Sequence, residues 1–346
     1  MTEQLVVGRA DIAAAAGGPG PDAAAKPART GIARWVLRRV LFGIVTLFAV
    51  SVIIFVTTHL LPGDAARAIL GQTATPERVA ALRHELGLDR SLVVQYLNWI
   101  GGLLRLDPGE SLASGQPVTE VIGWRVSNSL QLLVAAAVVS IPLSVGLGVL
   151  AAVRPGGRVD NAINGVSVVL AALPEFVTAL VLVLLFSTGL LHLLPAVSLS
   201  SKGELPLLHP QILVLPVLTL TLAVIPYLTR LVRASLIEAL NSDYVVMARL
   251  KGVPPRLILL RHALRNGLVP AVQGSALTLA YLLGGVVIVE FVFQYPGLGT
   301  SLQESVSQRD MPVLQAAVLF FATAYVVFNI VADVLTVLIT PRLRTR

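Results

Sequence analysis

Six long apolar runs constrain this chain more than any other feature of its sequence. Each approaches or exceeds the roughly 20 residues that a helix needs to cross a hydrocarbon layer about 30 Å thick. The runs cover residues 40–61, 130–153, 162–191, 212–229, 268–289 and 313–332. Five contain no Asp, Glu, Lys or Arg, and the third contains only Glu175. Because the runs do not alternate in polarity as barrel strands do, they predict an all-α membrane protein with six transmembrane helices.

The composition of the 346 residues agrees with a membrane protein, since 55% are hydrophobic and only 13% are charged. The net charge of +7 raises the alternative of nucleic-acid binding, but aromatic residues, which stack on bases, make up only 5%. No cysteine is present, and the five histidines have no metal-ligand spacing. No G-x-S-x-G motif is found either, which disfavours a membrane hydrolase. We therefore expect no nucleic-acid partner, no catalytic residue, no metal site and no cofactor in this chain.

The first 30 residues are rich in Ala, Gly and Pro and lack an apolar face, which predicts a disordered tail. A cleavable signal peptide is the alternative. The basic residues Arg34, Arg38 and Arg39, however, lead into a run too long for a signal core, and no small-residue cleavage site follows it. Residues 31–62 are therefore predicted to remain as the first transmembrane helix.

Lys and Arg residues predict the orientation, because short cytoplasmic segments retain positive charge. With the N-terminus inside, 18 of the 26 Lys and Arg residues lie in cytoplasmic segments and eight in outer segments. We expect a protein of the bacterial cytoplasmic membrane with both termini, 1–30 and 341–346, in the cytoplasm. Glu290 and Asp333, at the ends of the fifth and sixth runs, are expected near water or headgroups.

The outer segment 63–127 is too long for a simple turn and predicts a small extracytoplasmic helical subdomain. Its first helix is expected to be capped by Thr75, to start at Pro76 and to end at Gly87. A second helix follows from about residue 91, where the spacing of Tyr96 and Trp99 suits an interfacial aromatic belt. Residues 128–340 then form the predicted transmembrane core.

A basic cytoplasmic loop, residues 233–266, interrupts this core. We expect a helix from Arg233 to Lys251, a C-terminal cap at Gly252, and a second helix that starts after Pro254. In the first helix, the acids Glu238 and Asp243 are expected near the bases Arg249 and Lys251. Such a short, charged element can insert into a groove of a soluble partner; the alternative is that inner loops are simply basic.

The order of residues in this loop resembles the EAA loop of bacterial ATP-binding-cassette importer permeases, in particular the oligopeptide, dipeptide and nickel permease family. The matching residues are Glu238, Ala239, Leu240, Asp243, Tyr244, Ala248, Arg249, Lys251, Gly252, Arg261, His262, Ala263, Leu264, Arg265, Asn266 and Pro270. Further segments are similar to family signatures: HLLPGDAA at 59–66, RHELGLDRSLVVQYLNWI at 83–100, YPGLG at 295–299, RDMP at 309–312 and NIVADVLTVLITPRLR at 329–344.

This resemblance implies a type I importer permease fold of the MetI-like kind and a non-catalytic permease subunit that imports short peptides. It implies as partners a second permease, two nucleotide-binding subunits that hold ATP and Mg²⁺, and an extracytoplasmic solute-binding protein. No G-x-x-x-x-G-K-[ST] phosphate loop occurs in this chain, so ATP must act through a partner. The resemblance assigns the coupling to ATP hydrolysis to Glu238, Ala239, Asp243, Tyr244, Ala248, Arg249, Lys251 and Gly252.

Three departures from the family pattern leave the cargo open. They are Asp107–Glu110 in place of a glycine-rich turn, Thr340 in place of an Asp, and the two prolines after Gly252. Nickel chelates, glutathione and haem therefore stand beside peptides as cargo.

Glu175 follows Pro174, which frees a backbone carbonyl and allows a bend in the third run. Glu175 has two interpretations, because an ionisable group at membrane depth is costly and marks a functional site by default. It either lines the translocation path and meets a cationic group such as a peptide ammonium, or it is a structural acid bonded to a neighbouring helix. An ion-coupled carrier and an uncoupled scaffold or channel are the alternatives to an ATP-driven importer, and a single intramembrane acid offers the carrier little support.

Overall fold

The structure is a computed structural model that describes residues 29–60, 65–70, 74–85, 87–189, 191–201 and 203–339. Within these ranges the chain forms helices and no strand. The predicted tails lie outside the described residues, except for Arg29 and Thr30, which already belong to the first helix. Thr340, one of the departures from the family pattern, also lies outside them.

Five long apolar helices confirm five of the six predicted crossings. They are α1 (Arg29–Leu60), α5 (Val118–Val153), α8 (Pro210–Leu240), α12 (Val269–Phe293) and α14 (Met311–Ile339). Each extends beyond its apolar run, because amphipathic turns at the helix ends continue the same backbone hydrogen bonding. All five have the length and composition of membrane-spanning helices.

The third run, 162–191, was predicted as one crossing with a bend allowed at Pro174, and the structure breaks it. It forms α6 (Arg158–Ala172) and α7 (Glu175–Val183), whose axes differ by 103°, followed by the π-helical turn η2 (Leu184–Thr188). Pro174 lacks an N–H group, and Leu173 before it takes an extended conformation (φ −88°, ψ 125°). The third run is therefore a sharply bent pair of helices, as Pro174 allowed, and it makes a sixth span if the pair is counted as one.

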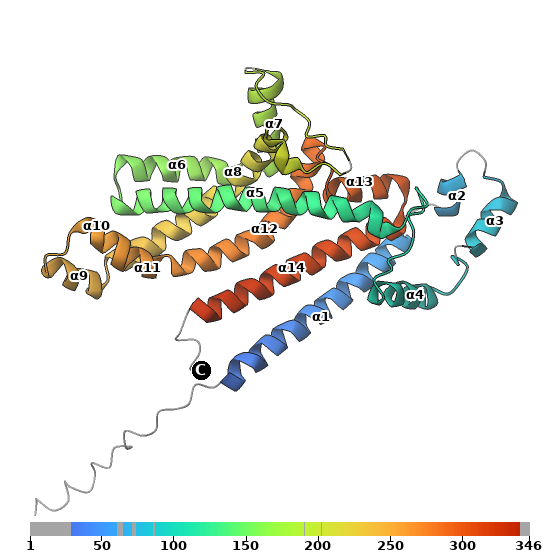
Figure 1. The fold of residues 1–346 in the computed structure, drawn as a ribbon, viewed down its shortest axis with the longest axis horizontal. Coiled ribbons are helices and arrows are strands. Elements are labelled where there is room, and N and C mark those ends of the chain that lie inside the picture. The colour runs from blue at the N-terminus through green and yellow to red at the C-terminus, as the bar shows by residue number, and fades with distance from the viewer. Residues whose placement is uncertain are drawn as a thin grey trace, which may run out of the picture.

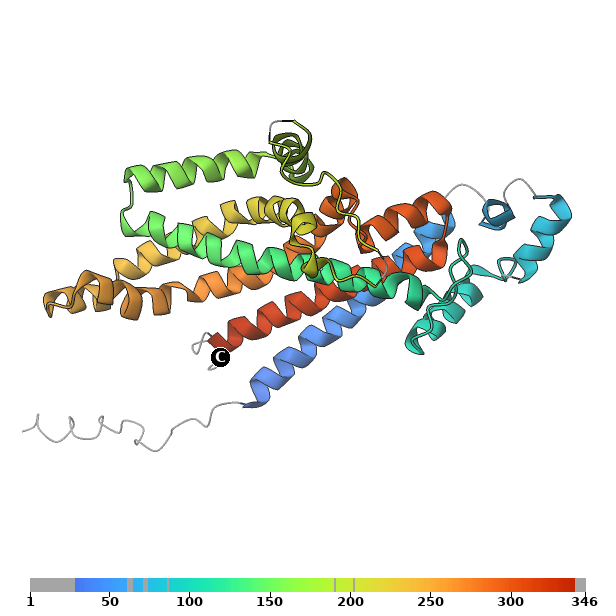
Figure 2. The same ribbon diagram turned by 45° about the horizontal axis from the view of Figure 1, so that its top comes forward.

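Helix α8 lies at the centre of the packed core. It packs against α5, α6, α7 and α12, and it contributes the fully buried residues Leu220 and Leu228. Close packing depends on a small residue: a Cβ added at Gly148 of α5 would lie 2.6 Å from Val232 Cβ of α8. The pair α1 and α14 lies beside this core, side by side along the lower edge of Figure 1 and again in Figure 2.

The two ends of the bundle differ in structure (Figure 1). One end holds the α5–α6 turn and the short helices α9 (Asp243–Leu250), α10 (Pro255–Leu257), η4 (Ile258–Ala263) and α11 (Leu264–Gly267). The start of α1 and the end of α14 point toward this same end, where Arg39 Nε and Asp333 Oδ2 form an ion pair at 2.7 Å. The opposite end holds α13 (Leu298–Gln308) and the segment between α1 and α5.

That segment contains the predicted helices, as α2 (Ala65–Leu70), α3 (Pro76–Glu85) and α4 (Leu92–Leu104). Gly87 has a left-handed φ of +65°, as its predicted place at a helix end requires. The rings expected in an interfacial belt instead pack on α1: Tyr96 Oη lies 2.8 Å from Ser51 Oγ, and Trp99 stacks on Phe55 at 5.9 Å. The predicted extracytoplasmic position of these helices stays a prediction.

Candidate functional site

The loop after α8 forms two helices where the sequence predicted one. Helix α8 ends at Leu240, and Ser242 is extended (φ −74°, ψ 153°) before α9 begins. The Ser242 hydroxyl donates a hydrogen bond to the carbonyl oxygen of Ala239 at 2.5 Å. Such a local side-chain bond competes with helix continuation, so the prediction of one helix from Arg233 to Lys251 was wrong.

Gly252 ends α9 as the sequence predicted. Its φ is +77°, its N–H donates to Arg249 O at 2.9 Å, and the next N–H, of Val253, donates to Ala248 O at 3.1 Å. These two bonds form a Schellman motif, which requires a left-handed residue at the position of Gly252. Pro254 is extended, and Pro255 starts the return through α10, η4 and α11.

Helix α9 exposes most of its surface, and only Val245 is buried. Four large apolar side chains, Tyr244, Val246, Met247 and Leu250, are exposed, and Leu250 is 77% exposed. Asp243, Arg249 and Lys251 are exposed around them, whereas Ala248 is half-buried. An apolar tip with a charged rim at the far end of a bundle is the surface pattern of a docking element.

The expected contacts between acids and bases in this loop do not form. Arg249 Nη2 instead lies 3.5 Å from the carbonyl oxygen of Leu240, and Glu238 and Asp243 are exposed. Among the described residues, no ion pair joins either acid to Arg249 or Lys251. Their charges are therefore available to a partner rather than paired inside the chain.

The base of this loop is fixed firmly to α8. The Ser235 hydroxyl donates to Gly267 O at 2.8 Å, and a Cβ added at Gly267 would lie 3.3 Å from Ala239 Cβ. Helix α11, which leads into α12, thus contacts the last turns of α8 directly. The loop that carries α9 is thus attached at one end to α8 and at the other, through α11, to α12.

Asp160 and Arg233 form a buried ion pair that the sequence analysis did not identify. Asp160 is 1% exposed and accepts from Arg233 Nε at 2.6 Å and Nη2 at 2.7 Å. Its Oδ2 also accepts from the N–H of Gly156, in the α5–α6 turn, at 2.7 Å. Asp160 is the one acid in the basic segment 154–160, which was predicted to be cytoplasmic. Counting only Lys and Arg residues overlooks such an acid. The pair joins the α5–α6 turn to α8, two helical turns before α8 ends.

Glu175 lies at the start of α7, directly after the break, and its side chain is half-buried. Its carboxylate lies against α12, where a Cβ added at Gly285 would be 2.7 Å from Glu175 Oε2, and Tyr281 is its polar neighbour. The residue therefore lies where α7 meets α12, at the break in the third crossing.

Glu290, expected near water or headgroups, is fully buried, so that expectation was wrong. Its Oε1 accepts from Ser129 Oγ at 2.5 Å, and its Oε2 accepts from the N–H of Gly299 at 2.6 Å. The Ser129 hydroxyl in turn accepts from the N–H of Leu298 at 2.8 Å. Glu290 thus binds the first N–H groups of α13, which have no partner within their own helix.

The YPGLG and RDMP signatures lie at the two ends of α13. In the first, the Tyr295 hydroxyl donates to Asn128 O at 2.9 Å, and Asn128 Nδ2 returns a bond to Pro296 O at 2.9 Å. In the second, buried Asp310 accepts from Ser111 Oγ and from the N–H of Leu112 at 3.1 Å. These signatures tie α13 to the start of α5 and to the loop before it.

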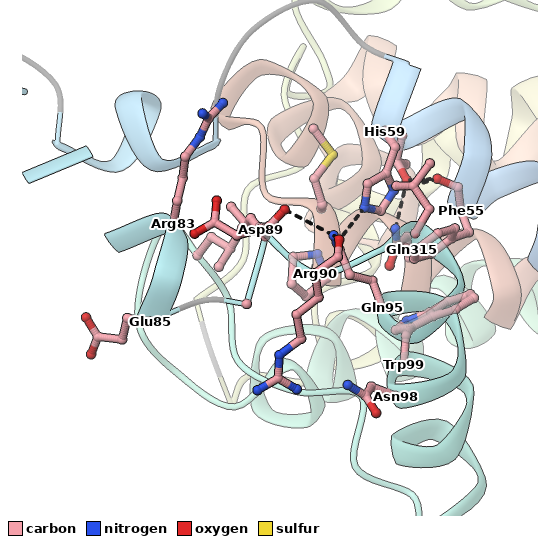
Figure 3. Close-up of a pocket in the computed structure, with 17 residues that line it drawn as sticks. Phe55, His59, Arg83, Glu85, Asp89, Arg90, Gln95, Asn98, Trp99 and Gln315 are labelled. Atoms are coloured by element: carbon pink, nitrogen blue, oxygen red, sulfur yellow. Dashed lines mark hydrogen bonds between the residues drawn. The ribbon is translucent and has the colours of Figure 1, made fainter. Parts of the chain in front are cut away.

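A cleft of about 650 Å³ lies between α1, the α3–α4 loop, α4 and the start of α14 (Figure 3). His59 Nε2 lies 3.1 Å from Gln95 Oε1, and Gln95 Nε2 donates to the carbonyl oxygens of Leu88 and Arg90. Figure 3 shows the Arg83 and Arg90 side chains extending away from this network in opposite directions. The polar groups near His59 thus hold the α3–α4 loop against α1.

No group of three His, Asp or Glu side chains in the described ranges is arranged to hold a metal ion. Among the described residues, the features that point to a function are the exposed α9 loop and the polar side chains within the long apolar helices.

Two protein-family models together match nearly the whole chain. Residues 144–345 match the binding-protein-dependent transport system inner membrane component, and residues 32–143 match the N-terminal part of the same kind of membrane component. The border between the two matches falls inside α5, a continuous helix, so it does not mark a structural domain boundary.

Curated relatives match over most of their length. The probable peptide ABC transporter permease protein y4tP of Sinorhizobium fredii is 36% identical over 313 residues, which cover 90% of this chain and 99% of that protein. The glutathione transport system permease protein GsiC of Salmonella choleraesuis is 38% identical over 310 residues, and that of Escherichia coli K12 is 37% identical over 310 residues. Each match covers 90% of this chain and 98% of the relative.

Proposed function

The chain belongs to the family of binding-protein-dependent transport system inner membrane components, the permeases of ABC importers, and we propose that it passes short peptides into the cytoplasm. In this proposal ATP hydrolysis on two partner subunits drives transport. A second permease completes the translocation path, and an extracytoplasmic solute-binding protein delivers the cargo. ATP and Mg²⁺ bind to the partner subunits. The α9 end of the bundle, with both chain termini, lies in the cytoplasm.

The observation that carries the proposal is the exposed tip of α9. Tyr244, Met247 and Leu250 place apolar surface at the far end of the bundle, and the unpaired acids and bases around them can form ion pairs with a partner. The Schellman cap at Gly252 fixes the direction of this tip. If α9 binds two conformational states of the ATPase with different affinities, a change of ATPase state shifts the balance between two packings of α8 and α12.

The coupling residues divide into two roles in this proposal. Asp243, Tyr244, Arg249 and Lys251 contact the ATPase, because their side chains are exposed on α9 or its cap. Glu238 and Ala239, at the end of α8, set the angle at which α9 leaves α8, and Ala248 and Gly252, at the end of α9, set the turn into the return segment. The contact of Gly267 with Ala239 then transmits the displacement to α12.

Peptide cargo is supported by the relatives. One is named a peptide transporter permease and others are named glutathione permeases, and glutathione is itself a modified tripeptide. We extend this cargo class, short peptides and peptide-like acids, to the present chain. No observation on the described residues favours nickel chelates or haem.

The variant Leu250→Asp tests whether α9 binds an ATPase. The wild-type permease should co-purify with its ATPase subunit, and the solute-binding protein should stimulate ATP hydrolysis in proteoliposomes. Leu250→Asp places a charge at the centre of the apolar tip, so affinity for the ATPase should fall at least about tenfold, or about 1.4 kcal/mol.

Leu104→Asp is the matched control, because Leu104 of α4 is 82% exposed at the opposite end of the bundle. It should leave ATPase binding unchanged. Equal ATPase affinity for wild type and Leu250→Asp would refute the assignment of α9. Uptake that needs an ion gradient and no ATPase would point to an ion-coupled carrier.

A further inference from the structure

A second cleft, of about 370 Å³, lies among α6, α8 and α12, on the part of these helices that crosses the membrane. Its polar lining comes from Tyr227 and Arg230 of α8 and from Thr278 and Tyr281 of α12. Tyr227 is 49% exposed and Tyr281 is 57% exposed. Thr278 is buried and the other lining residues are apolar, so the polar side chains that this face exposes are Tyr227, Tyr281 and Arg230. An exposed arginine between two tyrosines is unfavourable against lipid tails, which favours water, cargo or protein at this face.

The orientation of Arg230 supports this conclusion. The residue lies at the inner border of the apolar part of α8, where a long side chain would normally extend toward the headgroups. Its Nε instead donates to the carbonyl oxygen of Pro226 at 2.9 Å, one turn back toward the membrane centre. The side chain is exposed, and within the described ranges it makes no ion pair. An exposed guanidinium that lines a cleft calls for an anionic partner.

A carboxylate lies further along the same helices. Glu175 contacts α12 at Gly285 and neighbours Tyr281, which also lines the cleft. On α12, Leu277 lines the cleft and Gly285 contacts Glu175. These two positions are about 12 Å apart along the helix axis. An extended tripeptide spans about 10 Å. A short peptide laid along this stretch of α12 is therefore long enough to reach from the cleft that Arg230 lines to the carboxylate of Glu175.

We propose that Arg230 and Glu175 form a binding stretch for zwitterionic peptides, with the cargo carboxylate on Arg230 and its ammonium on Glu175. The rings of Tyr227 and Tyr281 contact the cargo between these ends and donate hydroxyl hydrogen bonds. This inference rests on the proposed function and assigns specificity to residues of the permease itself. It also chooses the path-lining interpretation of Glu175 over the structural one.

Uptake of trialanine, its C-terminal amide and its N-acetyl form by the reconstituted complex tests the proposal. Each variant is compared with wild type on the same cargo and with the same binding protein, so the preference of the binding protein cancels. Arg230→Gln should lower uptake of trialanine at least tenfold but change uptake of the amide less than twofold. Glu175→Gln should give the same contrast between trialanine and the N-acetyl form.

Arg230→Lys keeps the charge and should retain more trialanine uptake than Arg230→Gln. Arg34→Gln, at an exposed position of α1 outside the cleft and the coupling loop, should behave as wild type. An equal loss for acid and amide, with ATPase stimulation intact, would overturn the binding stretch and leave the proposed function standing. If the solute-binding protein does not stimulate ATP hydrolysis by the wild-type complex, the proposed function itself is refuted. Normal trialanine uptake by both charge-removing variants would also overturn the inference.

Discussion

Single residues set the direction of the coupling element. Gly252 has a φ of +77° and open space around its Cα, so only the backbone conformation, not a steric contact, restricts this position. Ser242 provides the other turn, through its bond to Ala239 O. A short exposed helix like α9 has few packing contacts of its own, so these two residues largely determine where its apolar tip points.

Gly252→Val tests this point. A side chain with a Cβ at a left-handed φ costs about 1 kcal/mol or more, so the cap should rearrange and α9 should change direction. We expect normal membrane insertion with transport uncoupled from ATP hydrolysis, measured as cargo moved per ATP consumed. Gly203→Val is the matched control, because Gly203 also has a positive φ (+93°) and open surroundings but lies in another loop. Wild-type transport by Gly252→Val would remove Gly252 from the coupling joint.

At the scale of elements, the connection from α12 through α13 to α14 depends on one buried carboxylate. Glu290 belongs to α12, yet its hydrogen bonds go to the start of α13 and to Ser129 of α5. Gly297 and Gly299 permit this arrangement, because a Cβ at either position would overlap the Glu290 carboxylate. Three helices therefore meet at a single side chain with no exposure to solvent.

Gly297→Ala should disrupt this meeting point. The added methyl overlaps the Glu290 carboxylate, so we expect a loss of about 1–3 kcal/mol in stability, typical of overpacking in a core. Thermal unfolding of the purified protein in detergent measures the effect. Gly284→Ala serves as control, because a Cβ at Gly284 of α12 meets nothing within 4 Å and should leave the melting temperature unchanged or slightly raised. An unchanged melting temperature for Gly297→Ala would contradict the packing described.

At the scale of the whole molecule, the helices place two kinds of surface at opposite ends. The α9 tip and the ends of α1 and α14 share one end, and α13 with α2, α3 and α4 occupies the other (Figures 1 and 2). The Asp160–Arg233 pair and the Ser235–Gly267 bond tie the first end together. Force applied at α9 would thus reach α5, α8 and α12 as one connected unit.

Cysteine labelling tests the orientation of the two ends. The chain has no native cysteine, so a single introduced thiol is unique. A membrane-impermeant maleimide should label Leu250→Cys only from the cytoplasmic side and Leu104→Cys only from the outer side. Leu228→Cys, at a fully buried position, should stay unlabelled from both sides. Labelling of Leu250→Cys from outside would reverse the orientation and exclude an ATPase at α9.

Parts of the candidate site could be predicted because they depend on local chemistry. The cap at Gly252, the start at Pro255 and the helix ended by Gly87 each follow from the conformations that glycine and proline favour. The break at Ser242 was not predicted from the sequence. It depends on whether the Ser242 hydroxyl bonds to a nearby backbone carbonyl or leaves the backbone hydrogen bonds of the helix intact. Pro174 indicated a bend, but its size depends on how α7 packs against α8 and α12.

The sequence by itself determined that the chain is a helical membrane protein, where its long helices lie and which loop resembles a coupling element. These follow from hydropathy and from the order of residues along the chain. Only the tertiary structure decided that Glu290 is buried, that Asp160 pairs with Arg233, and that Tyr281 both lines the cleft with Arg230 and neighbours Glu175. The physical reason is that the cost of a charge depends on its three-dimensional neighbours, which can lie far away in the chain, as Ser129 lies 161 residues before Glu290.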